Sequence, residues 1–276
     1  MKKTAIVCAL TLLALPAFVA CAKQDKAEGK APAEEIVEPL LPEEQPPTQE
    51  PTVSEEPGDD KEANEKENAT ATYLKITAGS LNVRAGAGTI YSTLGSVEKN
   101  ILMGYVGKSG EWYETRYMGK TAFVHSSYAE PVTLKAGDEK IERVIEEGLK
   151  VLGTPYVYGA TRYHNGKGNL IKGFSDKKFD CSSLMQYIFY QGAGVLLNMN
   201  TRTQISQGKE VKELQRGDLM FFTNASRKNN TGLERVGHVA LYLGDNYILH
   251  TASDYAKIEQ ISSTRWSYFL SARRMF

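Results

Sequence analysis

Residues 22–72 contain almost nothing from which a folded core could be built. They hold seven of the ten prolines, fifteen acidic residues and five lysines, and no aromatic residue. A segment of this composition cannot bury enough apolar surface to offset the entropy lost on ordering. We therefore expect residues 22–71 to be a disordered acidic linker, with a folded body only after it.

The segment before this linker has the pattern of an export signal. Lysines at positions 2 and 3 precede an uncharged apolar run over residues 4–20, which is short for a membrane span. Phe18-Val19-Ala20-Cys21 resembles a bacterial lipobox, in which Cys21 is lipidated, whereas Ala20-x-Ala22 would suit ordinary signal peptidase and full secretion. We favour the first and predict a lipoprotein-type signal peptide over residues 1–21, which would tether an extracytoplasmic protein to the bacterial membrane.

The formal net charge of the chain hides two opposite parts. The sum is zero, but the linker carries −10, and residues 73–276 carry 26 basic against 18 acidic residues, or +8. A basic body outside a bacterium suits an anionic surface such as a cell-wall polymer, although an ordinary basic surface explains the charge equally well. Nothing in the sequence resembles a nucleic-acid-binding module, so we expect no nucleic-acid partner.

Cys181 is the one cysteine left in the predicted body. The chain has three cysteines, of which Cys8 lies in the signal peptide and Cys21 is the candidate for lipidation. A disulfide framework is therefore excluded, although an extracytoplasmic compartment would permit one. Cys181 is thus either a small buried hydrophobe or a reactive thiol, and its neighbours must decide.

Residues 72–132 have the pattern of short strands. Gly, Asn and Ser separate five runs rich in β-branched and aromatic residues, namely YLKIT, LNVRA, ILMGYVG, EWYETRY and TAFVHSS. Five such strands in about sixty residues predict a small all-β barrel.

From residue 136 the periodicity becomes helical. Apolar residues recur at helical spacing between residues 141 and 152, and Pro155 lies just past the end. The polar, Gly-rich stretch TRYHNGKGNLIKGFSDKK then predicts a surface loop, in which His164 is a solvated residue.

A second helix is expected to begin at Cys181. Apolar side chains at Leu184, Met185 and Ile188 share one stripe with the cysteine, and Asp180 is a natural N-cap. Free backbone N–H groups and the positive end of the helix dipole stabilise an anion in the first turn. We therefore expect a depressed pKa for the Cys181 thiol, which is the environment of a nucleophile.

Two histidines lie in the apolar strands that follow, His238–Leu243 and Tyr247–Ala252. If the connecting loop has an odd length, with Leu243 opposite Tyr247, Ala240 pairs with His250, and the two histidines become diagonal neighbours on one face. A two-residue loop would place them on opposite faces. We predict the odd loop, and with it a site made of Cys181, His238 and His250.

A zinc site is the alternative interpretation of one cysteine and two histidines. No short C-x-x-C or H-x-x-x-H spacing holds this set together, and a fourth ligand is not evident, so we favour catalysis and expect no metal and no cofactor.

The motifs in the body resemble two known families. Residues 136–276 are similar to the NlpC family of papain-like cell-wall cysteine peptidases, through the motifs GTPYVYG (153–159), FDCSSL (179–184), TRTQ (201–204), RGDLMFF (216–222), GHVA (237–240), LHTA (249–252) and SARR (271–274). Residues 72–132 resemble a bacterial SH3-like domain through LNVR (81–84), GEWY (110–113) and GKTAFVH (119–125). The resemblance implies an α+β fold, in which a papain-like domain with N-terminal helices on an antiparallel sheet follows a small all-β barrel. Ser183 departs from the nucleophile motif of the family, which usually has glycine there, and the stretch between Tyr156 and Cys181 is longer than expected.

The resemblance also implies roles for individual residues. Cys181 would attack a peptide carbonyl, His238 would pair with its thiolate and protonate the leaving amine, and His250 would orient His238. The backbone N–H of Cys181 and the hydroxyl of Tyr156 would bind the oxyanion. The implied substrate-binding residues are Asp180, Ser182, Ser183, Arg202 and Thr203. Asp180 could hold a free amine of the substrate or only cap the helix, and the two interpretations weigh equally.

The sequence thus predicts a monomeric peptidoglycan endopeptidase that hydrolyses stem peptides at the bond between γ-D-glutamate and a diamino acid. A cross-bridge endopeptidase, an amidase of the same superfamily and a catalytically silent wall-binding lipoprotein are the alternatives. The predicted partners are cell-wall peptides and, through lipidated Cys21, the membrane. The SH3-like domain would bind the wall, brace the cleft or act only as a spacer.

Overall fold

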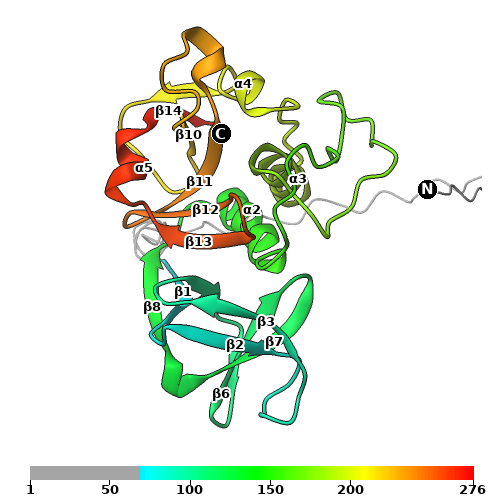
Figure 1. Cartoon of the computed structure of the whole chain (residues 1–276), viewed down its shortest axis with the longest axis vertical. Helices are drawn as coiled ribbons and strands as arrows, with labels where there is room; N and C mark the ends of the chain where they lie inside the picture. The colour runs from blue at the N-terminus through cyan, green and yellow to red at the C-terminus, as the bar shows by residue number, and fades with distance from the viewer. Residues whose placement is uncertain (1–68) are drawn as a thin grey trace, which may run out of the picture. The chain divides into compact units, whose positions relative to one another are not determined.

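The computed structural model describes residues 69–276 and contains two antiparallel sheets (Figure 1). The predicted signal peptide, the lipidation of Cys21 and nearly all of the predicted linker lie outside the described residues. The first strand begins at Thr70, within the last residues assigned to that linker. No helix within residues 69–276 is both long enough and apolar enough to cross a membrane.

The smaller sheet has five strands and belongs entirely to the N-terminal region. Its strand order is β3-β2-β7-β6-β5, with bounds β2 (Ser80–Arg84), β3 (Thr93–Glu98), β5 (Gly107–Ser109), β6 (Trp112–Tyr117) and β7 (Lys120–His125). Three of the five predicted runs form β2, β6 and β7 here, and the other two form strands of the larger sheet. The short strands β3 and β5 were not expected, because Gly95, Ser96 and Lys108 interrupt the apolar pattern that marks a strand.

The larger sheet has nine strands and unites the N-terminal region with the C-terminal one. Its order is β8-β1-β4-β13-β12-β11-β10-β14-β9. Its strands are β1 (Thr70–Ile76), β4 (Leu102–Gly104), β8 (Ala129–Lys135), β9 (Lys209–Val211), β10 (Leu219–Phe222), β11 (His238–Gly244), β12 (Tyr247–Thr251), β13 (Ala256–Gln260) and β14 (Phe269–Arg274). The junction is the pairing of Leu102 in β4 with Ile258 in β13.

Two long helices pack beside this sheet. They are α2 (Glu139–Lys150) and α3 (Cys181–Ala193), and shorter helices occur at α4 (Thr201–Gln204), α5 (Ser263–Ser267), η1 (Ser126–Tyr128) and η2 (Gly232–Arg235). The two long helices approach closely, because a Cβ on Gly192 would lie 2.5 Å from the backbone of Val144. The α+β architecture predicted from the sequence is therefore confirmed.

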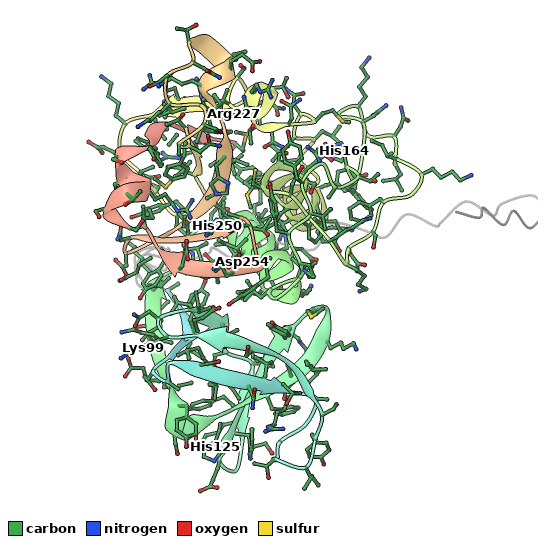
Figure 2. The ribbon with its side chains drawn as sticks, viewed as in Figure 1. Lys99, His125, His164, Arg227, His250 and Asp254 are labelled. Atoms are coloured by element: carbon green, nitrogen blue, oxygen red, sulfur yellow. The ribbon has the colours of Figure 1, made fainter. Side chains whose placement is uncertain are left out.

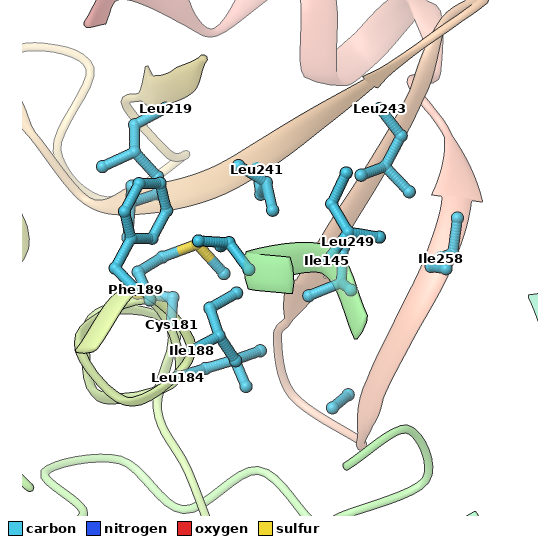
Figure 3. Packing of buried hydrophobic residues seen from close by; sticks show 14 of the residues in the cluster. Ile145, Cys181, Leu184, Ile188, Phe189, Leu219, Leu241, Leu243, Leu249 and Ile258 are labelled. Atoms are coloured by element: carbon cyan, nitrogen blue, oxygen red, sulfur yellow. The ribbon is translucent and has the colours of Figure 1, made fainter. Parts of the chain in front are cut away.

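The main core lies between α3 and the central strands. Figure 3 shows apolar side chains of α3, among them Leu184 and Ile188, facing Leu241 of β11 and Leu249 of β12. The same cluster includes Tyr73 and Leu102 from the N-terminal strands. The core that positions α3 is thus built from both regions of the chain.

Candidate active site

The start of α3 is fixed by a capping box. The Asp180 carboxylate accepts a hydrogen bond from the backbone N–H of Ser183, at 2.8 Å, and the Ser183 hydroxyl accepts one from the Asp180 N–H, also at 2.8 Å. Each partner satisfies a backbone donor that the helix itself leaves free. Ser183 is fully buried, so its hydroxyl serves the helix start instead of the substrate surface. Cys181 is the first residue of the helix and is only 8% exposed.

Asp180 has no acceptor position left over. Its Oδ1 accepts from Ser182 Oγ at 3.0 Å as well as from the Ser183 N–H. Its Oδ2 accepts from Arg162 Nη1 at 2.8 Å and from the Gly159 N–H at 3.2 Å. A carboxylate offers about four lone-pair sites, and these four donors fill them. Asp180 therefore caps the helix, and Arg162 balances its charge.

The hairpin of β11 and β12 brings the two histidines together. Leu241 pairs with Leu249 and Tyr242 with Ile248, which is the strand register predicted from the sequence. The loop, however, differs from the prediction: Gly244 lies opposite Tyr247, and only Asp245 and Asn246 form the turn, both with positive φ. A bulge between Tyr242 and Gly244 supplies the extra residue that a two-residue turn would have removed.

The histidines form part of a hydrogen-bonded relay. His238 Nε2 lies 3.1 Å from His250 Nδ1, and His250 Nε2 lies 3.0 Å from Glu259 Oε1. Arg265 Nη2 also donates to Glu259 Oε1, at 3.0 Å. His250 is fully buried on β12, and Figure 2 labels it among the central strands.

Glu259 and Arg265 were not among the site residues predicted from the sequence. The position of Glu259 in the strand that follows His250 was the one signal available in the sequence. The strand β13 pairs with β12 so that His250 lies opposite Lys257, two residues before Glu259. A charged side chain two positions along a paired strand lies on the same face as His250.

The relay fixes the positions of the protons on both rings. Although burial raises the pKa of Glu259, the hydrogen bond from His250 and the charges around it lower that pKa to about 2. An ionised carboxylate can only accept, so His250 Nε2 carries a proton and His250 Nδ1 is an acceptor. His238 Nε2 then donates to His250, which leaves His238 Nδ1 unprotonated and able to act as a base.

The acidity of Cys181 is the reverse of the expectation from its place at a helix start. Burial, assisted by the negative charge of Asp180, raises the pKa of the Cys181 thiol to about 12. The backbone N–H groups of Val239 and Ser182 and the charge of Arg162 lower the pKa by less. The helix dipole favours the thiolate, but the cost of desolvating the thiolate is larger and determines the direction of the pKa shift. Cys181 is thus a neutral thiol in the free protein.

His238 is also neutral. Burial, together with the neighbouring His250 and the charge of Arg265, lowers the pKa of His238 well below its ordinary value. Burial likewise lowers the pKa of His250, although the hydrogen bond that His250 donates to Glu259 opposes this shift. At neutral pH the site therefore holds a thiol and an uncharged imidazole, instead of the thiolate–imidazolium pair predicted from the sequence.

Cys181 lies where two hollows of the surface meet. The smaller has a volume of 320 Å³ and is lined by His238, Arg265 and Tyr268 among others. The larger has a volume of 460 Å³ and is lined by Arg162, Asp180 and Arg227 among others. Both hollows include Tyr156, Cys181, Asn224 and Gly237. An extended substrate crossing from one to the other would pass over the sulfur.

The structure separates the predicted substrate-binding residues into two groups. Tyr156, Asp180, Ser182 and Arg202 line the larger hollow, and Tyr156 also lines the smaller. Thr203 lines neither hollow. Its side chain is exposed, and its hydroxyl bonds Asn200 at the start of α4. It acts as a helix cap, in the same way as Ser183.

Three further residues near the site were not singled out from the sequence. Gln204 is fully buried and donates to the backbone oxygen of Ser182 at 3.0 Å, which ties α4 to the nucleophile helix. Arg162 and Arg227 come from loops without a periodic pattern, so no signal identified them. His164 was expected to be solvated but is completely buried, with Tyr190 and Tyr163 beside its ring.

Sequence comparisons place both regions among known proteins. Residues 153–275 match the NlpC/P60 family, and residues 79–130 match the bacterial SH3 domain. Gamma-DL-glutamyl hydrolase of Bacillus subtilis (strain 168) is 27% identical over 181 residues, which are 64% of this chain and 37% of that protein. Peptidoglycan endopeptidase RipA of Mycolicibacterium smegmatis (strain ATCC 700084 / mc(2)155) is 33% identical over 116 residues, 41% of this chain and 21% of that protein. Gamma-D-glutamyl-L-lysine dipeptidyl-peptidase of Bacillus subtilis (strain 168) is 27% identical over 175 residues, 62% of this chain and 52% of that protein.

The alignments span about half or less of the length of these three relatives. The SH3 match contains strands β2 to β7, and the NlpC/P60 match contains Cys181, His238 and His250. Both resemblances drawn from the sequence are thereby confirmed. Residues 153–275 are an NlpC/P60 family domain, of a family of cysteine peptidases, and a bacterial SH3 domain precedes it in the chain.

Proposed function

We propose that this protein is an extracytoplasmic peptidoglycan endopeptidase, which hydrolyses stem peptides between γ-D-glutamate and a diamino acid. The observation that carries the proposal is the relay from Glu259 through His250 to His238, placed beside Cys181 where two hollows meet. A cysteine that only packs in the core does not require an oriented, uncharged imidazole beside it, whereas a nucleophilic cysteine does.

The neutral thiol and imidazole determine how the first step runs. The Cys181 sulfur attacks the scissile carbonyl carbon while His238 takes the thiol proton, so the costly buried thiolate never accumulates. The new C–S bond gives a tetrahedral intermediate. His238 then returns the proton to the leaving amine, and the C–N bond breaks to leave a thioester on Cys181.

Water completes the cycle. His238, now uncharged again, accepts a proton from a water molecule as that water attacks the thioester carbon. The C–S bond breaks, and the sulfur recovers its proton from His238. Throughout, Glu259 and His250 keep the His238 ring in one orientation and in one tautomer, as the third member of a catalytic triad does.

The oxyanion requires donors on the side of the carbonyl oxygen. The backbone N–H of Cys181 belongs to the first turn of α3, where N–H groups have no partner within the helix. Tyr156 lines both hollows, and burial and the neighbouring Cys181 raise the pKa of its phenol, so it stays a hydrogen-bond donor. We propose these two groups as the oxyanion hole.

The chosen bond and the location rest on the relatives. Two of the three relatives named above carry gamma-glutamyl in their names, and the third is a peptidoglycan endopeptidase. The match to the NlpC/P60 family and the peptidoglycan endopeptidase among the relatives support an extracytoplasmic location. Lipidation of Cys21, a monomeric state and wall binding by the SH3 domain remain proposals from the sequence.

Digestion of defined stem peptides tests the proposal. The protein and its Cys181→Ala variant are incubated with L-Ala-γ-D-Glu-diamino acid peptides, and the products are identified by mass spectrometry. We expect release of L-Ala-γ-D-Glu by the native protein and no release by the variant. A different fragment would keep the enzyme and reassign the bond, whereas cleavage by both forms would remove Cys181 from the mechanism.

A further inference from the structure

The larger hollow beside Cys181 is unusually rich in arginine. Arg162, Arg202 and Arg227 line it, and Asp180 is its only acidic lining residue. The three arginines come from three separate segments: the loop before α3, the helix α4, and the loop after β10. Figure 2 labels Arg227 on the last of these. Side chains of one charge that converge on a concave surface favour a ligand of the opposite charge.

Negative charge already present does not cancel this excess. Arg162 pairs with Asp180, whose four acceptor positions are all occupied. Glu234 is shared between the other two, since its Oε1 accepts from Arg202 Nη1 at 2.7 Å and its Oε2 from Arg227 Nη1 at 3.3 Å. Three cations thus face two carboxylates, and the hollow retains one positive charge.

The donors left over have the geometry for a carboxylate. Arg162 is committed to the fold, because it also bonds the backbone oxygens of Ala160 and Met199 and the Ser182 hydroxyl. Within residues 69–276, the guanidinium groups of Arg202 and Arg227 donate only through Nη1. Nε and Nη2 of both remain open, and this edge of a guanidinium binds a carboxylate through two parallel hydrogen bonds.

The substrate of the proposed function carries a carboxylate at a suitable position. When glutamate is linked through its γ-carboxyl, its α-carboxylate remains, separated from the attacked carbon by two methylene groups and the α-carbon. With the attacked carbon at Cys181, that carboxylate must enter one of the two hollows. Arg265, the only arginine of the smaller hollow, is paired with Glu259. The larger hollow is therefore the one whose arginines, Arg202 and Arg227, have unused hydrogen-bond donors.

We propose, resting on the proposed function, that Arg202 and Arg227 bind the free α-carboxylate of the γ-linked glutamate. The enzyme then selects stem peptides whose glutamate is unamidated and discriminates against D-isoglutamine, in which this carboxylate is an amide. The same hollow is not a site for a free substrate amine, because Asp180 has no acceptor left and the surroundings are positive.

The test compares two stem peptides that differ only at this group, one with the α-carboxylate and one with the α-amide. We expect kcat/KM to be higher for the acid by about tenfold or more, because the amide leaves charged donors without a partner. Arg227→Gln and Arg202→Gln should each reduce this ratio several-fold. Glu234→Gln, which changes an exposed side chain outside the hollow lining, should preserve or increase it.

A binding measurement separates this inference from the proposed function. The Cys181→Ala protein is titrated with each peptide by calorimetry, and the fold of every variant is checked by circular dichroism. Tighter binding of the acid supports the inference even if the native protein cleaves neither peptide, a result that would overturn the proposed function alone. Equal cleavage of acid and amide within about twofold, equal binding of the two, or a ratio unchanged in Arg227→Gln and Arg202→Gln would overturn the inference.

Discussion

At the scale of single residues, the activity proposed here depends on Glu259 as well as on the three residues that a cysteine peptidase obviously needs. Glu259 itself lines neither hollow, and it acts on His250 through a 3.0 Å contact. It is a positioning residue, because its ionised state determines which nitrogen of each ring holds a proton.

Replacing this carboxylate should therefore impair catalysis more than binding. In Glu259→Gln, the amide can donate to His250 Nε2, which would place the ring protons so that His238 no longer offers a free nitrogen to the thiol. We expect kcat to fall by about 10²-fold with KM changed by less than about threefold, within the range that general base catalysis contributes. Steady-state kinetics on a stem peptide provides the measurement.

The matched control for this variant is Glu213→Gln. Glu213 is exposed, and its carboxylate makes no hydrogen bond or ion pair within residues 69–276, so kcat should be unchanged. Nitrogen-15 chemical shifts of the imidazoles report the tautomer directly. A kcat for Glu259→Gln within about twofold of the native value would show that His250 is oriented by something other than Glu259.

The pKa values predict an unusual pH dependence for alkylation of Cys181. Burial raises the pKa of this thiol to about 12, so the reactive thiolate fraction should grow about tenfold with each pH unit through the neutral and mildly alkaline range. Iodoacetamide inactivation rates, measured from about pH 5 to pH 10, should rise throughout. A plateau reached below pH 7 would instead indicate a preformed thiolate–imidazolium pair.

The residues that the sequence revealed are those with a local signal. Cys181 follows an N-cap, and the two histidines lie in two apolar strands on either side of Gly244-Asp245-Asn246, so local patterns brought them into consideration. Arg162, Arg227 and Arg265 come close to the site only through tertiary packing, and a charged residue in a loop has no distinguishing pattern. The raised pKa of Cys181 was also missed, because the helix start is visible in the sequence and the depth of burial is not.

At the scale of elements, the capping box of α3 explains why a serine, Ser183, stands where the nucleophile motif usually has glycine. The Ser183 hydroxyl accepts from the Asp180 N–H in an environment from which water is excluded. A glycine at this position would leave that N–H without its partner. The serine that departs from the family pattern is thus accounted for by the local structure of the helix start.

Removing this hydroxyl should destabilise the fold and leave the chemistry largely in place. Ser183→Ala leaves a buried N–H unsatisfied, and we expect the free energy of unfolding to fall by about 1–3 kcal/mol, as measured by urea denaturation. Thr203→Ala removes the same capping role at an exposed position of α4 and should cost less than about 1 kcal/mol. Equal effects of the two variants would contradict the role assigned to burial.

The hairpin of β11 and β12 marks the limit of prediction for elements. The strand register was predicted correctly, but from an assumed odd loop, because both strands are nearly continuous buried runs with no alternation that would set a register. The bulge at Leu243 and Gly244 was not, because an odd loop and a two-residue turn with a bulge have the same net register. The two loop types differ in the positive φ of Gly244, Asp245 and Asn246, and the pattern of apolar residues carries no information on backbone angles.

At the scale of the whole molecule, the SH3 and NlpC/P60 regions share a sheet, a core and a buried polar network. Arg216 donates to the Tyr73 hydroxyl at 2.6 Å and to both oxygens of Glu142, at 2.6 and 2.8 Å. Tyr73 lies in β1 and Glu142 in α2, so one side chain of the β9–β10 segment ties together both regions. The sequence indicated two folded units, because the pairing of β4 with β13 joins residues too far apart in the chain for any local pattern to reveal.

This shared construction predicts that the two regions unfold together. Calorimetry should show a single transition for the SH3 and NlpC/P60 regions, with equal calorimetric and van't Hoff enthalpies. Arg216→Met should lower the stability of that one transition by about 1–3 kcal/mol, since the buried Tyr73 hydroxyl and the partly exposed Glu142 carboxylate both lose the guanidinium. Two resolved transitions would mean that the regions are independent despite the common sheet.

The most direct test of the central claim is to trap the thioester on Cys181. The protein is mixed with the α-carboxylate stem peptide, quenched in acid within a turnover, and analysed by intact mass and by peptide mapping. We predict a transient mass increase equal to L-Ala-γ-D-Glu minus water, located on the peptide that contains Cys181 and absent from Cys181→Ala. Substrate turnover by the Cys181→Ala protein, or an acyl group mapped to any other residue, would contradict the account.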